Sequence, residues 1–130
     1  MENYITDDSL KHIKLEMQAG VVGIAVTRVY IKDTGNYKKL FDSEPGAGGH
    51  ISETKVGVNR LLENDILKVN TYMDLSNLTP QQRQKAIANI YIMYTLSGGV
   101  EGDKNFEVDP LEIDTTDPLR VLITKKLKFV

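Results

Sequence analysis

The sequence contains no cysteine and no tryptophan, and it has only two histidines, His12 and His50. Without cysteine, the chain can form no disulfide, no thiolate zinc site and no thiol nucleophile. Without tryptophan, a carbohydrate-binding surface lacks its most effective stacking side chain. With two histidines, there are few candidates for acid–base catalysis near neutral pH. The composition therefore disfavours several classes of site before any motif is considered.

Long apolar runs and a surplus of positive charge are also missing. No stretch approaches the ~20 apolar residues of a membrane span, and the first ten residues, MENYITDDSL, are acidic where a signal peptide needs a basic region. The formal net charge is −2, from 16 basic and 18 acidic residues, so nonspecific nucleic-acid binding is not expected. We expect synthesis in the cytoplasm and no membrane insertion.

What remains is typical of a folded protein with many strands. The length and the ordinary share of hydrophobic residues predict one domain over residues 1–130. Alternating apolar residues with β-branched and aromatic enrichment predict strands. These are expected at residues 12–18, 21–32, 37–41, 50–58, 66–75, 105–109 and 119–129. The segment 10–18 also fits one face of a helix, and we favour the strand.

The longest apolar run, residues 86–99, follows Thr79-Pro80 and ends at Gly98-Gly99. Thr79 and Gln82 have the spacing of a capping box, which predicts a short helix near residues 80–86. In the rest of the apolar run, the alternation of apolar residues favours a central strand over a continued helix. Strands separated by turns, without long helices, predict a mainly β, antiparallel β-sandwich or jelly-roll-like barrel.

No catalytic, cofactor or metal site is predicted with named residues. His50 beside Glu53 is a weak candidate for a general base, and Ser97 lacks the glycine that precedes a nucleophile elbow. The glycine-rich stretch 45–50 has no Gly-Lys-Ser/Thr, so it predicts a loop and not a nucleotide site.

An acidic segment, residues 101–118, precedes a basic one, residues 120–128. They are either two solvated faces or complementary patches in a head-to-tail contact between subunits. Residues 103–114 resemble a calcium loop only weakly, because Val108 replaces the turn glycine and Asp114 the last glutamate. A tyrosine platform for a sugar or a protein is a further alternative. Its candidates are Tyr30, Tyr37, Tyr72, Tyr91 and Tyr94. Tyr72 stands out because it lies on the polar face of the strand at 66–75, opposite the apolar face of Leu67, Val69, Met73 and Leu75.

The leading hypothesis is a non-enzymatic structural protein that is built into a larger assembly of the virion, tail or appendage type. Its partners would be proteins, as a homo-oligomer or a multi-protein complex. The final strand reaches almost to the last residue, so we expect both chain ends to be held in place. A glycan-binding or calcium-binding module is the alternative hypothesis, and a small hydrolase-like enzyme is the third.

Overall fold

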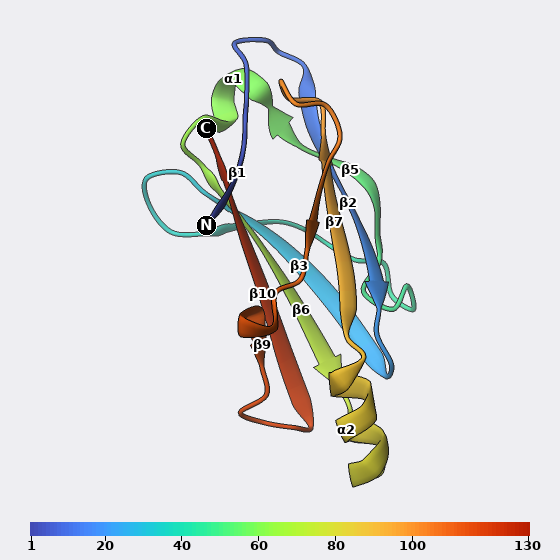
Figure 1. Ribbon diagram of the computed structural model, residues 1–130. Coiled ribbons are helices and arrows are strands. Elements are labelled where there is room, and N and C mark those ends of the chain that lie inside the picture. The colour runs from blue at the N-terminus through green and yellow to red at the C-terminus, as the bar shows by residue number, and fades with distance from the viewer.

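The computed structural model describes all 130 residues and shows two β-sheets packed against each other, with 51% of residues in strands and 12% in helices (Figure 1). One sheet has six strands: β1 (Glu2–Tyr4), β3 (Ile24–Lys32), β4 (Lys38–Asp42), β6 (Ile66–Asp74), β9 (Ile113–Asp114) and β10 (Arg120–Phe129). The other has four: β2 (His12–Gly20), β5 (Ile51–Val58), β7 (Tyr91–Ser97) and β8 (Lys104–Glu107). The helical segments are α1 (Asn59–Leu62), α2 (Pro80–Ala88) and the 3₁₀ turn η1 (Pro110–Glu112). The predicted β-sandwich is confirmed.

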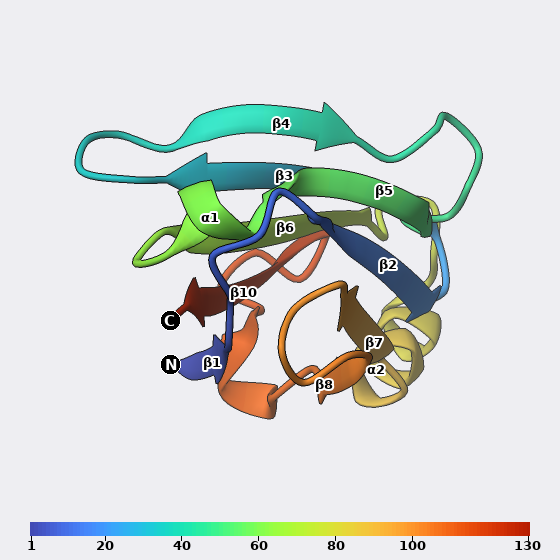
Figure 2. The ribbon, with the colours of Figure 1, turned by 90° about the horizontal axis from the view of Figure 1, so that it is seen from above.

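The strand order is β1-β10-β6-β3-β4 in the larger sheet, with β9 also paired to β10, and β5-β2-β7-β8 in the smaller one. Every pair is antiparallel except β1 with β10, which is parallel. Seen from above, the sheets form two curved layers around a shared interior (Figure 2). The core between them contains 23 buried hydrophobic residues.

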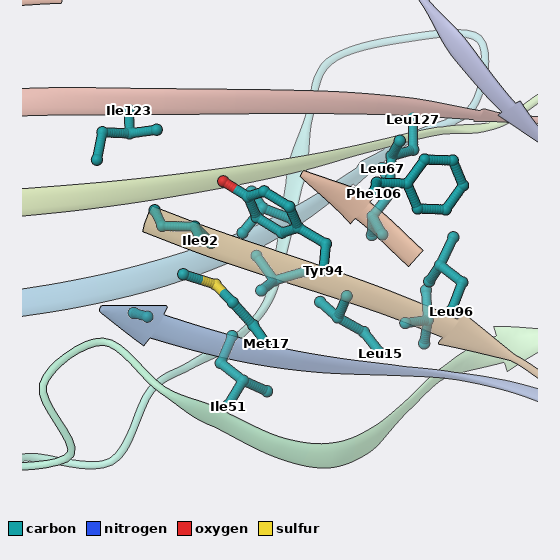
Figure 3. Packing of buried hydrophobic residues seen from close by; sticks show 14 of the residues in the cluster. Leu15, Met17, Ile51, Leu67, Ile92, Tyr94, Leu96, Phe106, Ile123 and Leu127 are labelled. Atoms are coloured by element: carbon teal, nitrogen blue, oxygen red, sulfur yellow. The ribbon is translucent and has the colours of Figure 1, made fainter. Parts of the chain in front are cut away.

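Strand β6 shows how the sequence specifies these layers. Leu67, Val69, Thr71 and Met73 alternate along it and are all at most 1% exposed, because successive side chains of a strand point to opposite faces. The buried side chains of the two sheets interdigitate in the core. Figure 3 shows Leu67 and Ile123 of the larger sheet opposite Ile92 and Tyr94 of the smaller one. The predicted inward face of this strand is confirmed.

The apolar run 86–99 divides between a helix and a strand. The Thr79 hydroxyl accepts from the Gln82 amide (3.2 Å), and the Gln82 side chain accepts from the Thr79 amide (2.9 Å), so the capping box is formed. Helix α2 continues to Ala88, and β7 starts only at Tyr91, between β2 and β8. The central strand is therefore shorter than predicted, because its first residues complete the helix.

Other boundaries differ from the sequence-based expectation. Residues 21–23 form a turn and not the start of a strand, because Gly23 has a φ of +100° and any side chain there would meet the backbone carbonyl of Asp74. The ambiguous segment 10–18 is the strand β2, which continues to Gly20. The short strands β1 and β9 were not expected.

Both chain ends are hydrogen-bonded to each other. The Val130 amide donates to the Tyr4 carbonyl (3.0 Å), and the Thr6 amide donates to the Val130 carbonyl (2.7 Å). Beside them, the fully buried rings of Tyr4 and Phe129 pack edge to face at 6.4 Å. None of the helices is long and apolar enough to span a membrane.

Candidate interaction site

The outer face of the six-stranded sheet carries large apolar side chains in adjacent strands. Val26 on β3, Tyr72 on β6 and Leu122 on β10 are cross-strand neighbours in one row. With Ile24 they line a groove of about 310 Å³, which we call the outer groove, and Arg28, Arg120 and Asp74 form its charged rim. Exposed fractions of 61% for Ile24, 37% for Val26 and 39% for Tyr72 leave these side chains open to solvent.

Tyr72 is held in the outer groove by its neighbours. The Arg28 guanidinium lies 5.4 Å from the centre of its ring, and the Asn70 side-chain amide donates to its hydroxyl (3.4 Å). The Asn70 carbonyl oxygen in turn accepts from the Thr124 hydroxyl (3.0 Å). The prediction that Tyr72 lies on the polar face of its strand is confirmed, and these contacts fix the ring as part of a preformed surface.

Next to the outer groove, three lysines surround one tyrosine ring. The ammonium groups of Lys68, Lys32 and Lys126 lie 4.0, 5.4 and 5.9 Å from the centre of the Tyr37 ring. Lys68 is also 4.9 Å from the centre of the Tyr30 ring. None of the three lysines forms an ion pair within the chain. We call this set the lysine cluster.

The lysine cluster contains a repulsive contact. Lys126 lies directly opposite Lys68 on the neighbouring strand, and like charges in that position destabilise a sheet. The negative face of the Tyr37 ring offsets part of this repulsion. The cluster therefore favours a negatively charged group beside it.

A second charged arrangement lies between the sheets. Lys125 is 3% exposed, and its ammonium group contacts a carboxylate oxygen of Glu2 (2.6 Å), the Glu107 carbonyl (3.0 Å) and a carboxylate oxygen of Glu112 (3.3 Å). These contacts tie β10 to β1, β8 and η1. No sequence pattern indicated this role for Lys125, because its carboxylate partners lie 13 and 123 positions away in the chain.

The acidic segment presents one protruding apolar residue. The side chain of Asp109 accepts from the Leu111 amide (2.8 Å), and the Asp109 amide donates to the Glu112 side chain (2.7 Å), so η1 is capped. Leu111 at its tip is 95% exposed. Around it, the exposed carboxylates of Glu107, Asp109 and Asp114 form no ion pair.

Asp114 accepts hydrogen bonds from a neighbouring residue of its own loop. Hydrogen bonds from the side chain and backbone of Thr116 hold the pKa of Asp114 below its usual value. Leu111 and Asp114 border a hollow of about 420 Å³ together with Leu122 and Lys126 of β10. The protruding leucine therefore lies on the same side of the molecule as the outer groove.

The predicted catalytic candidates are not assembled into a site. His50 accepts a 3.4 Å hydrogen bond from the Ala19 amide, whereas Glu53 forms an ion pair with Lys14 (3.2 Å). His50 and Glu53 border one shallow hollow, but no hydrogen bond joins them. Ser97 lies at the end of β7, on the same strand as the buried Tyr94, and neither histidine bonds to it.

The glycine-rich stretch 45–50 is a loop, as predicted. Its Gly49 is buried, has a φ of +84° and accepts a hydrogen bond from the Thr27 hydroxyl (2.7 Å). That hydroxyl also bonds to Thr71 (3.0 Å), and the Thr27 amide bonds to the Ser43 hydroxyl (2.9 Å). The loop is therefore anchored to the core through a buried hydroxyl network.

The remaining candidate sites are the calcium loop and the tyrosine platform. No three acidic or histidine side chains come together as a group that could hold a metal ion, in residues 103–114 or elsewhere. Of the five tyrosines, Tyr94 is fully buried and Tyr91 lies on the other sheet. Tyr30, Tyr37 and Tyr72 do share the outer face of the six-stranded sheet with the lysines. The outer groove was not predicted, because it depends on strand register, and the exposure of Leu111 in η1 was not predicted either.

Comparisons with protein-family models, with curated proteins and with solved structures found no match to this chain.

Proposed function

We propose that the protein is a non-enzymatic assembly subunit, built into a larger complex of the virion, tail or appendage type, and that it associates with copies of itself. The observation that carries this proposal is the outer groove, in which Ile24, Val26 and Tyr72 are exposed side by side on a regular sheet. Clustered apolar side chains with a polar rim are typical of protein-binding surfaces. Scattered exposed apolar residues would carry no such meaning.

The outer face of the six-stranded sheet is also large enough for a protein–protein interface. Strands β3 and β6 have nine residues each. Across four adjacent strands of the sheet, β10-β6-β3-β4, this length gives a face of roughly 30 Å by 20 Å, on the order of the ~800 Å² that each partner buries in a standard interface. The contacts of Arg28 and Asn70 hold Tyr72 in place before binding, so little side-chain entropy is lost on association. A rigid aromatic residue with a nearby arginine is a common centre of binding energy.

Sedimentation velocity from micromolar to millimolar protein concentration tests the proposal. We expect the wild type to associate and the double variant Val26→Glu/Tyr72→Glu to stay monomeric, because it places two carboxylates in the outer groove. The matched control is Tyr91→Glu, at an exposed tyrosine of the other sheet, and it should associate as the wild type does. A wild type that is monomeric at every concentration would overturn the proposed function.

A further inference from the structure

One surface element is suited to the outer groove by its apolar side chain and by the charges beside it. Leu111 protrudes almost completely into solvent from the capped turn η1. A leucine exposed to this degree contributes nothing to the core of its own chain, and the capping hydrogen bonds of Asp109 hold it in a fixed position. The rigid projection of an apolar side chain is a property of binding residues.

The charges around the two elements are complementary. Glu107 and Asp109 border one hollow with Leu111, and Asp114 borders another. Lys126 borders both hollows, but none of the three carboxylates forms an ion pair within the chain, so the surroundings of Leu111 are acidic on balance.

The outer groove is lined by two basic residues, Arg28 and Arg120, and one acidic residue, Asp74, so its charge is positive on balance. Arg120 lies opposite Asp74 on the neighbouring strand but forms no ion pair within 4.0 Å, and Arg28 is 4.0 Å from the carboxylate of Asp42. Opposite charges placed around an apolar contact favour one orientation and speed association.

We infer that Leu111 of one copy docks into the outer groove of a second copy, with its neighbouring carboxylates against the arginines of the rim. This inference rests on the proposed function and names its partner. Leu111 and the groove residue Leu122 border the same hollow, so both elements lie on one face. Two copies that meet face to face therefore dock in both directions at once, as the self-complementary surface of a two-fold dimer requires.

The size of the buried side chain sets the expected effect of removing it. Burying a leucine side chain contributes about 1.5–3 kcal/mol, and each 1.4 kcal/mol is a factor of ten in a dissociation constant. Leu111→Ser should therefore weaken dimerisation roughly 10- to 100-fold for each of the two symmetry-related leucines. Leu61→Ser, at a leucine that is 74% exposed on α1, is the matched control and should leave the dissociation constant unchanged.

Complementation of two variants tests the docking directly. Leu111→Ser lacks the protruding leucine but keeps the groove, whereas Ile24→Glu keeps the leucine and places a carboxylate in the groove. Circular dichroism and thermal melts first establish that both are folded, which their high solvent exposure favours. Each variant alone should be monomeric, and an equimolar mixture should form a heterodimer in which one leucine occupies one intact groove, measured by sedimentation and by fluorescence anisotropy of a labelled variant.

The outcomes separate this inference from the proposed function. Restored association in the mixture supports the docking of Leu111. A Leu111→Ser variant that dimerises as the wild type does, or a mixture that stays monomeric, overturns the docking, while loss of association in Val26→Glu/Tyr72→Glu still supports the proposed function. Association that does not weaken with added salt also overturns the inference, because exposed charge pairs are screened by salt.

Discussion

Lys125 and Lys126 are neighbours on β10 but have opposite environments. Lys125 points between the sheets, is 3% exposed and contacts two carboxylates and a backbone carbonyl. Lys126 points outward, is exposed, and faces Lys68 with no carboxylate partner. One strand therefore carries a fully compensated cation and an uncompensated one at successive positions.

The difference separates charges that build the fold from charges that are available to a partner. A buried ammonium group loses its hydration, so it is stable only with oppositely charged groups and hydrogen-bond acceptors in place. An exposed ammonium group keeps its water and needs no partner within the chain. The inward charge at Lys125 thus has a structural role, and the outward charge at Lys126 remains free for intermolecular contacts.

The substitution Lys125→Met gives the largest expected effect. It keeps the length and much of the packing of the side chain but removes the cation that joins Glu2, Glu112 and the Glu107 carbonyl. Losing one member of a buried ion group costs about 3–5 kcal/mol, and the 56% exposure of the Glu2 side chain reduces this to about 2–3 kcal/mol. Urea unfolding measures the decrease in free energy of unfolding.

The control is Lys126→Met at the next position, where we expect a change within about 0.5 kcal/mol. Equal losses of stability in the two variants would show that burial does not distinguish these lysines. A Lys125→Met variant as stable as the wild type would show that Glu2 and Glu112 gain as much from water as from the ammonium group.

Most of the fold was predictable from local sequence patterns. The alternation in residues 66–75 predicted which side of β6 is buried, and the spacing of Thr79 and Gln82 predicted the start of α2. Both are short-range effects, because alternation follows from strand geometry and capping from the unpaired amides of one helical turn. The class of fold followed from the number of such strands.

The unpredicted features depend on residues far apart in the sequence. Strand β1 has three residues and forms only by pairing with β10, and Glu2 meets Lys125 across 123 positions. The outer groove is similar, because Val26, Tyr72 and Leu122 become neighbours only through the register of three strands. Tyr72 was singled out because its strand shows a clear polar face, but nothing local indicated what would lie beside it.

The contrast between the two lysines implies a rule: a polar group that points between the sheets is stable only with hydrogen-bond or ion-pair partners. Tyr94 tests this rule. Its hydroxyl is the only buried side-chain oxygen or nitrogen without a hydrogen-bond partner, and burial raises the pKa of Tyr94 well above its usual value. Figure 3 shows its ring projecting from β7 toward the facing sheet. An unsatisfied buried hydroxyl costs about 1–3 kcal/mol, so Tyr94→Phe should raise the free energy of unfolding by about 1 kcal/mol.

The matched control for Tyr94 is Tyr4, which is equally buried. Its hydroxyl donates to the Gly102 carbonyl (2.5 Å) and accepts from the Gly99 amide (2.8 Å). Tyr4→Phe should therefore lower the free energy of unfolding by about 1 kcal/mol, because it removes two partly buried hydrogen bonds. Opposite signs in the two variants, measured by urea unfolding, would support the rule; a loss of stability in both would contradict it for Tyr94.

The smallest expected effect concerns the outward charge. Lys126→Gln removes the repulsion with Lys68, so at low salt it should stabilise the monomer by about 0.2–0.5 kcal/mol, a gain that shrinks as salt screens the pair. Lys128→Gln is the matched control, because Lys128 lies on the same face of β10 but opposite Ile66, and it should show no such gain. Thermal melts at low and high salt measure both variants. A stabilisation of equal size in Lys128→Gln, or one that persists at high salt, would mean that Lys68 does not repel Lys126. Lys125 and Lys126 would then differ in their burial but not in the sign of the charges that act on them.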